Sequence, residues 1–239
     1  MLAIIHKRRD TIARIMECVT NYKCMNLTNI SGQTVLHLAV LVDLPQVVRA
    51  VVAHGGDVTA LDKRGNTPLH LACQHGYHEC VKALTTPLRY DETQARRYHI
   101  PYIRIPQNCD VRNYSGQSCL QLAASGNHYR VMRHLVKHCN ADINVCDWSS
   151  GNTLLHQAIQ DNNESLCNFL LSFGMLNVNA VRYDGLTPLA LARAAGRKAL
   201  ATTLHTSGAF ETSPQTLDVD DVTVDCYDDL KIDGTYVRA

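Results

Sequence analysis

Gly65-Asn66-Thr67-Pro68-Leu69-His70-Leu71-Ala72 decides the fold, because versions of this octet recur through the chain. A second clear copy begins at Gly32 with Gly-Gln-Thr-Val-Leu-His-Leu-Ala, and further copies open at Gly116, Gly151 and Gly185. The leading glycines are 33, 51, 35 and 34 residues apart. Three of the four intervals therefore share one period, and the second interval carries extra residues.

Each octet has the chemistry of a turn that leads into a helix. Glycine permits a positive φ, threonine can cap a helix, and proline is tolerated in a first helical turn. Leu69, Leu71 and Ala72 then form an apolar face that a single pair of helices cannot bury, so neighbouring units must cover it. A second helix is expected in each unit, over 45–52, 78–84, 129–137, 165–171 and 197–204, because apolar residues recur there at helical spacing.

A period of about 33 residues with two helices per unit is that of ankyrin repeats. The sequence therefore predicts an all-α ankyrin-repeat solenoid of about six repeats, the first of them truncated, followed by an acidic C-terminal tail. The ankyrin-repeat domain is expected over 1–210 and the tail over 211–239. The expected repeats lie near 1–31, 32–64, 65–115 with an insertion over 85–107, 116–150, 151–184 and 185–210.

The insertion contains Pro87, Pro101 and Pro106 and several tyrosines and arginines. We expect a loop with at most one short helix around 91–98. Loops of this length often have a function. The alternative is a surface insertion that is merely tolerated, because a longer loop adds little closure entropy.

Charge is segregated along the chain. Residues 1–208 hold 21 Lys and Arg against 14 Asp and Glu, a net charge of +7, whereas residues 209–239 hold two against eight, a net charge of −6. The candidate functional residues of the tail are six of its seven aspartates, Asp218, Asp220, Asp221, Asp225, Asp228 and Asp229. Apolar residues lie between them, although a tail that only keeps the protein soluble is the alternative.

Other classes of protein have little support. The ten cysteines include no Cys-x-x-Cys pair, which favours a reduced, cytoplasmic protein, with shuttling into the nucleus left open. The sequence contains no run of eighteen apolar residues, so it predicts no membrane-spanning helix. The dense His and Cys run from His70 to Cys80 lacks zinc-ligand spacing, and the sequence has no phosphate loop or nucleophile elbow. We expect no enzyme, no metal, no cofactor and no small-molecule substrate.

The order of these features resembles the IκB and insect Cactus proteins, the ankyrin-repeat inhibitors of Rel/NF-κB transcription factors. That family has six to seven repeats, an enlarged third repeat and an acidic tail after the sixth, and here the third unit is enlarged and acidic residues follow Ala209. The phrases Leu36 to Val40, Arg64 to Cys73 and Asn113 to Leu120 are similar to their family counterparts. An Asp-Ser-Gly-x-x-Ser element for induced degradation is not present in this sequence, so a fragment, a short isoform and a constitutive inhibitor remain alternatives.

The resemblance implies that the partner is a Rel/NF-κB-family transcription factor dimer, with no direct contact to nucleic acid or membrane. Early repeats would cover the nuclear-localisation segment, later repeats would hold the dimerisation domains, and the acidic tail would lie against the DNA-binding face. A polyanion competes for the cations that would otherwise bind DNA. The alternatives are a generic ankyrin adaptor for another protein and a nuclear coactivator of the same family.

Partner contacts are expected on the turns between repeats, because stacking occupies the other apolar positions. Trp148 is the strongest candidate, since it is the only Trp, lies in a turn and has polar neighbours, as interface residues often do. The alternative is that its ring folds over the adjacent repeat. The full set of expected contacts is Asp62, Arg64, Asn66, Asn113, Tyr114, Asp147, Trp148, Arg182, Tyr183 and Asp184.

Overall fold

A computed structural model describes residues 1–5, 14, 21–94 and 105–211 of the chain. It divides into two compact units, unit 1 over Met1–Val145 and unit 2 over Cys146–Ala239, and each is described by itself. The described residues form helices and turns, with one isolated β-bridge between Arg112 and Ser118. The predicted all-α ankyrin fold is confirmed.

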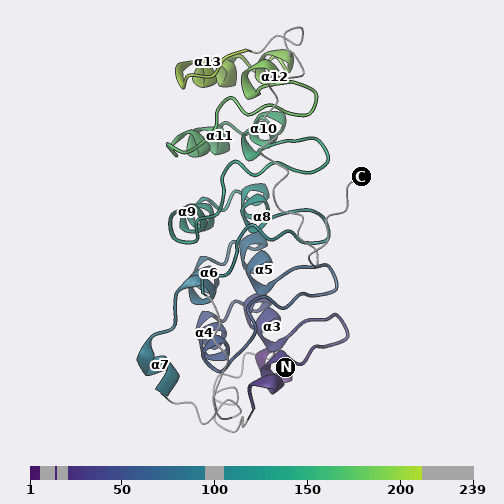
Figure 1. Cartoon of the computed structure of the whole chain (residues 1–239), viewed down its shortest axis with the longest axis vertical. Coiled ribbons are helices and arrows are strands. Elements are labelled where there is room, and N and C mark those ends of the chain that lie inside the picture. Colours follow the sequence, from purple (N-terminus) through teal and green to yellow (C-terminus); the bar gives the residue numbers. More distant parts are fainter. Residues whose placement is uncertain (6–13, 15–20, 95–104, 212–239) are drawn as a thin grey trace, which may run out of the picture. The chain divides into compact units, whose positions relative to one another are not determined.

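Unit 1 stacks pairs of short antiparallel helices. In it α3, α5 and α8 form one column and α4, α6 and α9 a second, and the long turns project on the side of the first column (Figure 1). Leucine, valine and alanine side chains fill the space between the pairs, with Leu36, Leu69 and Leu120 fully buried. The helices are α1 (Leu2–Ile5), η1 (Tyr22–Asn26), α3 (Val35–Leu41), α4 (Pro45–Ala53), α5 (Pro68–Gln74), α6 (His78–Thr85), α7 (Tyr90–Gln94), α8 (Cys119–Ser125) and α9 (Tyr129–His138).

Unit 2 repeats this arrangement with α10 (Leu154–Gln160), α11 (Glu164–Leu171), α12 (Pro188–Ala194) and α13 (Lys198–Thr206). Helix α10 packs on both α11 and α12, and α12 packs on α13. Leu154, Leu170 and Leu189 are buried between them. In both units, all five predicted second helices are confirmed with ends that differ by at most two residues.

The octet builds the start of each first helix as its chemistry predicts. Gly65 has a φ of +73°, a conformation that a residue with a Cβ rarely adopts. Thr67 Oγ1 then accepts a hydrogen bond from the backbone N–H of His70 at 3.3 Å, and Pro68 occupies the first helical position, where no backbone donor is needed. This cap fixes the point at which the chain turns from loop to helix.

The histidine of the octet joins one repeat to the next. His37 Nδ1 accepts from the Thr34 backbone N–H at 3.1 Å, while its Nε2 lies 3.0 Å from the carbonyl oxygen of Asn66 in the following turn. His70 contacts Val111 O in the same way at 3.0 Å, and in unit 2 His156 contacts Leu186 O at 3.3 Å. Since the carbonyl only accepts, Nε2 carries the hydrogen and Nδ1 remains an acceptor. For His37 and His156, whose pKa values are lowered, the ring works as a neutral imidazole.

Burial sets the protonation of two of these rings. It lowers the pKa of His37 below the ordinary value of 6.5, and it lowers the pKa of His156 to about 4. Burial also acts to lower the pKa of His70, but the hydrogen bond and charge interaction with Cys119 and the backbone contacts with Val111 and Gln117 together outweigh it and raise that pKa. Protonation of His156 would therefore cost both desolvation energy and the hydrogen bond that its Nδ1 accepts from Thr153.

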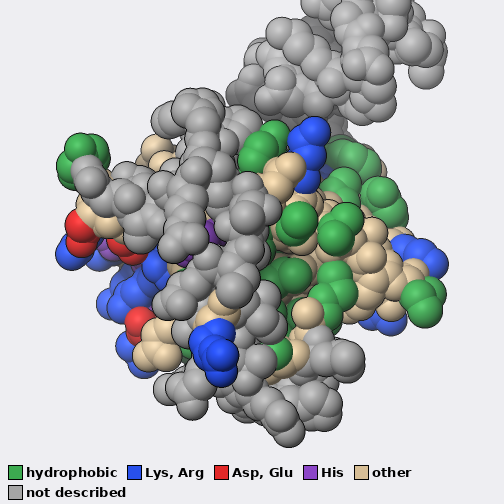
Figure 2. Space-filling model, turned by 90° about the horizontal axis from the view of Figure 1, so that it is seen from below, with side chains coloured by type: hydrophobic (Ala, Val, Ile, Leu, Met, Phe, Trp, Pro, Cys, Tyr) green, Lys and Arg blue, Asp and Glu red, His purple; other side chains and the backbone are tan. Residues whose placement is uncertain are grey.

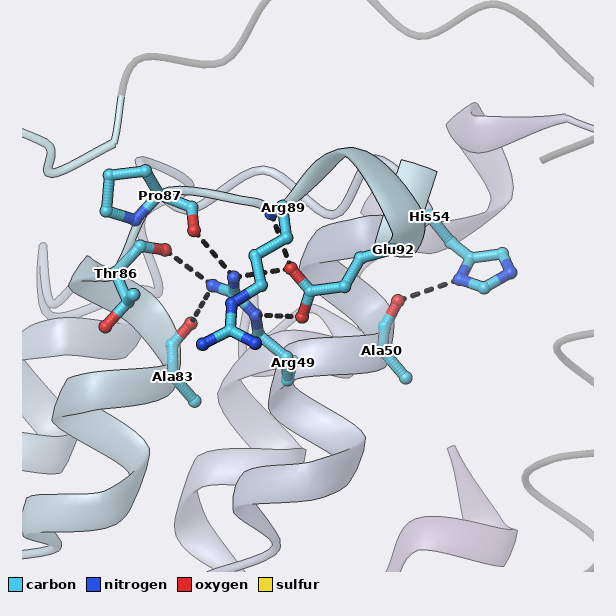
Figure 3. Close-up of polar contacts among 8 residues, drawn as sticks. All are labelled: Arg49, Ala50, His54, Ala83, Thr86, Pro87, Arg89 and Glu92. Atoms are coloured by element: carbon cyan, nitrogen blue, oxygen red, sulfur yellow. Dashed lines mark hydrogen bonds and ion pairs between the residues drawn. The ribbon is translucent and has the colours of Figure 1, made fainter. Parts of the chain in front are cut away.

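The start of the insertion is held against the second column of unit 1 by one arginine. Arg49, on α4, binds Glu92 of α7 through Nε and Nη2, each at 2.7 Å from a carboxylate oxygen (Figure 3). The same guanidinium donates to the carbonyl oxygens of Thr86 at 2.5 Å and Pro87 at 2.7 Å. The hydrogen bonds from Arg49 also lower the pKa of Glu92. The expected short helix is present as Tyr90–Gln94, and residues 95–104 lie outside the described residues.

The His156 environment predicts how unit 2 responds to acid. Above pH 6.5 the neutral ring contributes fully, and this contribution is lost as pH falls from 6.5 toward about 4, because the unfolded chain binds a proton that the folded ring resists. The loss amounts to about 3 kcal/mol in the free energy of unfolding. We expect His156→Gln to lose less stability than the parent protein over this interval.

Glutamine is a matched replacement, because Gln121 occupies the same register in the fourth repeat and accepts from the Ser118 backbone N–H at 2.8 Å. Denaturant unfolding at a series of pH values, followed by Trp148 fluorescence, measures unit 2. Equal pH slopes in the two proteins would contradict the prediction.

The Arg49 contacts predict local destabilisation by Arg49→Lys. An ammonium group cannot reproduce the bidentate pair together with the carbonyl contacts, so we expect segment 83–94 to lose about 1–3 kcal/mol of local stability. Hydrogen exchange at the Arg89 amide, which donates to Glu92 Oε2 at 2.7 Å, measures this. Lys82→Ala is the control, since Lys82 forms only an exposed pair with Glu79. Equal exchange in the two variants would rule out a special role for Arg49.

Candidate functional site

The turns in which the octets begin, here called fingers, share one backbone pattern. They comprise 29–33, 62–66 and 113–117 in unit 1 and 147–152 and 182–186 in unit 2. In each, the first residue donates its N–H to the carbonyl oxygen of the last, at 3.0 Å for both Asp62 and Asn113. Backbone bonds also connect fingers within a unit, as from Tyr114 N–H to Arg64 O at 3.1 Å.

Four of the predicted contact residues build the fingers. Asp62 Oδ1 accepts from the backbone N–H groups of Arg64 and Asn66, both at 2.8 Å. Asn113 Oδ1 accepts from Ser115 and Gln117 in the same way, and its amide donates to Asn66 Oδ1 at 2.9 Å. Asp62 and Asn66 are buried, so their side chains are used inside the protein rather than offered to a partner.

Asp147 has the same role in the fourth finger. Burial alone would raise its pKa, but hydrogen bonds from the backbone and hydroxyl groups of Ser150 and Ser149 lower it instead. The carboxylate stays charged because it is surrounded by donors. This negative charge closes the turn that carries Trp148.

The last finger departs from this pattern, because Arg182 stands where the others have Asp or Asn. Its guanidinium lies 3.3 Å from Asp184 Oδ2, and Asp184 Oδ1 accepts from the Leu186 backbone N–H at 3.3 Å. Asp184 therefore takes over part of the turn-building role two positions later. The Arg182 side chain is mostly covered, while Asp184 is exposed.

Three aromatic side chains of the predicted set are exposed at the fingers. The exposed fraction is 74% for Tyr114 in unit 1, and 68% for Trp148 and 57% for Tyr183 in unit 2. Arg64 is also exposed. An exposed aromatic ring offers a large contact area at a low cost in side-chain entropy. These four residues are the members of the predicted set best placed for partner contact.

Two of the exposed rings depend on the glycine of the neighbouring finger in the same unit. A Cβ on Gly65 would lie 2.5 Å from Cδ1 of Tyr114, and a Cβ on Gly151 would lie 2.9 Å from Cδ1 of Tyr183. The tyrosines therefore lie across glycines that leave room for their rings. The octet glycine thus has two roles, one in the turn and one in placing the tyrosine of the next finger.

Sequence reasoning missed apolar residues at the finger edges. Ile30, Leu61 and Val181 are exposed beside the first finger residues. Figure 2 shows hydrophobic and basic side chains together at the end of unit 1 where the chain begins. An apolar residue within an otherwise polar turn was the signal that could have identified them.

The start of the acidic tail is held by unit 2. Arg193 of α12 forms an ion pair with Glu211 at 2.6 Å. Asn179 Oδ1 accepts from the Phe210 backbone N–H at 3.0 Å, and Thr187 Oγ1 donates to Phe210 O at 3.1 Å. The six candidate aspartates of the tail, Asp218, Asp220, Asp221, Asp225, Asp228 and Asp229, lie outside the described residues.

Among the residues that the structure describes, no group of three or more His, Cys, Asp or Glu side chains is placed to hold a metal ion. In the same part of the chain, no helix is long and apolar enough to cross a membrane.

Comparison with known proteins supports the repeat assignment. The family model for ankyrin repeats (3 copies) matches residues 1–97, 100–179 and 120–214. The chain is 35% identical over 201 residues to the NF-kappa-B inhibitor cactus of Drosophila yakuba, covering 79% of this chain and 40% of that protein. It is 31% identical to the human NF-kappa-B inhibitor epsilon, covering 98% of this chain and 46% of that protein. The chain thus spans less than half the length of these relatives.

A solved structure also supports the ankyrin-repeat fold and the similarity to NF-kappa-B inhibitors. The ankyrin repeat domain of Bcl-3, described as a unique member of the IkappaB protein family, aligns with a TM-score of 0.74 and 32% identity, covering 87% of this chain and 85% of that one. The enlarged third repeat and the finger sequences had pointed to the same relatives. The chain belongs to the IκB family of ankyrin-repeat proteins.

Proposed function

We propose that this protein binds a Rel/NF-κB-type transcription factor dimer and inhibits it by covering its nuclear-localisation and DNA-binding surfaces. The relatives named NF-kappa-B inhibitors support the partner class. The observation that carries the mechanism is the fixed origin of the acidic tail, where Glu211 is paired with Arg193 and Phe210 is bound on both sides of its backbone. A tail that starts from a held position can be directed at one face of a bound partner.

The tail would act through its charge. With a net charge of −6 over residues 209–239, it can occupy the Lys and Arg side chains that would otherwise contact DNA phosphates. A partner held by the repeats also raises the local concentration of the tail near those cations. Inhibition then needs no catalysis, and retention of the partner in the cytoplasm would follow if the nuclear-localisation segment is covered.

The fingers would supply the contacts that hold the dimer. Tyr114, Trp148 and Tyr183 offer rings, and Arg64 offers a charge at an exposed position. Asp62, Asn66, Asn113 and Asp147 would act indirectly, because they set the turn that presents each neighbour. Arg182 and Asp184 would act together as a pair in the last finger.

The proposal predicts that Trp148→Ala weakens binding to a Rel homology dimer by about tenfold or more, because large aromatic side chains dominate the energy of interfaces. Isothermal titration calorimetry at fixed salt measures the affinity. Met175→Ala is the matched control, since Met175 is an exposed apolar residue of unit 2 outside the fingers. Unchanged affinity in Trp148→Ala would remove Trp148 from the site.

The tail predicts a separate effect on DNA release. A Rel dimer bound to labelled DNA should release it when the full chain is added, and a chain ending at residue 210 should bind the dimer but release much less DNA. Replacing the six candidate aspartates of the tail by asparagine keeps the length and brings the net charge of residues 209–239 from −6 to zero, so this variant should behave like the shortened chain. Fluorescence anisotropy of the DNA gives the released fraction, and higher salt should reduce the difference.

The same assay separates the other functions. A chain that joins the dimer while the DNA stays bound would be a coactivator. A chain that does not bind any Rel homology dimer would be an adaptor for another protein.

A further inference from the structure

The Thr-Pro dipeptide occurs at Thr67, Thr86 and Thr187, and its threonine is used differently at the second of these positions. Thr67 and Thr187 precede α5 and α12, where each hydroxyl oxygen accepts a backbone N–H at 3.3 Å, and both residues are buried. Thr86 is exposed and directly follows the last residue of α6. The same dipeptide therefore caps a helix at two positions and faces solvent at the third.

The residues around Thr86 have the pattern that a proline-directed protein kinase reads. Residues 86–89 are Thr-Pro-Leu-Arg, and they belong to neither α6 nor α7. Thr86 has an extended backbone, with a φ of −79° and a ψ of 128°, and protein kinases bind the residues around an acceptor hydroxyl in an extended form. Pro87 has no backbone N–H, so it suits a pocket that offers no acceptor there. Arg89 adds an exposed positive charge three positions after the threonine.

From this arrangement we propose that Thr86 is a phosphorylation site for a proline-directed protein kinase, and that its phosphate releases the start of the insertion from Arg49.

The phosphoryl transfer takes ATP as the donor. Thr86 Oγ1 attacks the γ-phosphorus, the bond between that phosphorus and the oxygen that bridges it to the β-phosphate breaks, and ADP leaves with the electron pair. The proton of the threonine hydroxyl passes to the catalytic aspartate of the kinase. The product carries about −1.5 to −2 charges at neutral pH on a side chain that was uncharged before.

All five N–H groups of the guanidinium beside Thr86 are engaged (Figure 3). An arginine side chain has five N–H donors. The acceptors of Arg49 are the carbonyl oxygens of Ala83, Thr86 and Pro87 and both carboxylate oxygens of Glu92. Five acceptors thus match five donors. A new anion can therefore bind Arg49 only by displacing an acceptor that is already present.

A phosphate on Thr86 would compete with Glu92 for this guanidinium. Arg49 Nη1 lies 2.5 Å from the carbonyl oxygen of Thr86 itself, so the phosphate would be attached to a residue that the guanidinium already contacts. Phosphate offers three strong acceptor oxygens and more negative charge than a carboxylate. The hydrogen bonds from Arg49 lower the pKa of Glu92, which keeps that group charged. The two anions would therefore repel each other.

Displacement of Glu92 would free the start of the insertion. Glu92 connects α7 to α4 through Arg49, and its Oε2 also accepts the backbone N–H of Arg89 at 2.7 Å. Both contacts are lost together when the carboxylate moves away. The packing of α4 on α6 rests on buried side chains such as Val51 and Leu84, and it would remain. The phosphate would thus act on the segment that follows α6 and leave the helix pairs in place.

The first test maps the phosphate on the full chain. A purified cyclin-dependent kinase, which is a proline-directed enzyme, is incubated with ATP, Mg²⁺ and the folded chain. The chain carries Ser213→Ala, because Ser213 also precedes a proline and lies outside the described residues. Mass spectrometry should find phosphate on Thr86, with Thr67 and Thr187 unmodified. An unmodified Thr86 with a kinase that is active on a standard peptide, or preferential modification of Thr67 or Thr187, would overturn the site.

The second test measures hydrogen exchange at the Arg89 amide in the phosphorylated protein. This amide should exchange about tenfold or more faster than in the unmodified protein, because it loses its charged acceptor on Glu92. Exchange in α8 should stay the same and serves as the internal control. An Arg89 amide that exchanges at the same rate or more slowly after phosphorylation would show that the phosphate does not release the segment.

A double comparison connects the effect to Arg49. Arg49→Lys already lacks the bidentate pair, so phosphorylation should accelerate exchange at the Arg89 amide much less in this variant than in the parent. Thr86→Ala is the matched control. After kinase treatment it should carry no phosphate at position 86 and should exchange like the untreated parent. Equal acceleration by phosphate in the parent and in Arg49→Lys would show that the phosphate acts without Arg49, and would overturn the mechanism.

Discussion

The protein depends on one constraint, which is that no helix pair can bury its own apolar face. Leu69, Leu71 and Ala72 are covered only because the neighbouring pairs of unit 1 pack against α5. The histidine hydrogen bonds then set the register between neighbours, since His37 reaches the carbonyl of Asn66 and His70 that of Val111. Burial of apolar side chains supplies most of the stabilisation. The histidine hydrogen bonds favour one alignment of neighbouring repeats over others.

The same constraint leaves part of each finger outside the packing between helix pairs. Their backbone is fixed by Asp62, Asn113 and similar residues, so an exposed ring such as Tyr114 or Trp148 projects from a rigid turn. A rigid turn loses little entropy when a partner binds. Residues that close the turn and residues exposed on it thus lie side by side in one short segment.

The insertion and the tail depart from the repeat, yet each is connected to it by an arginine. Arg49 holds the start of the insertion through Glu92, and Arg193 holds the start of the tail through Glu211. Both pairs join a helix of a repeat to the start of a segment outside the repeats. The repeat thereby fixes where these two segments begin.

The sequence by itself determined the repeat, the helix pairs and the family, because a glycine, a capping threonine and a spaced apolar face are local signals that each unit repeats. It also identified Trp148 and Tyr183 as turn residues, and both are exposed. Only the tertiary structure distinguished them from Asp62 and Asn66, since a short polar side chain in a turn can face water or close the turn, and its partners are backbone groups that sequence does not position. The pairing of Arg49 with Glu92 and the contact of His37 with Asn66 O join residues 43 and 29 positions apart. Such contacts are decided by stacking of one repeat on the next, which brings distant side chains to the same place.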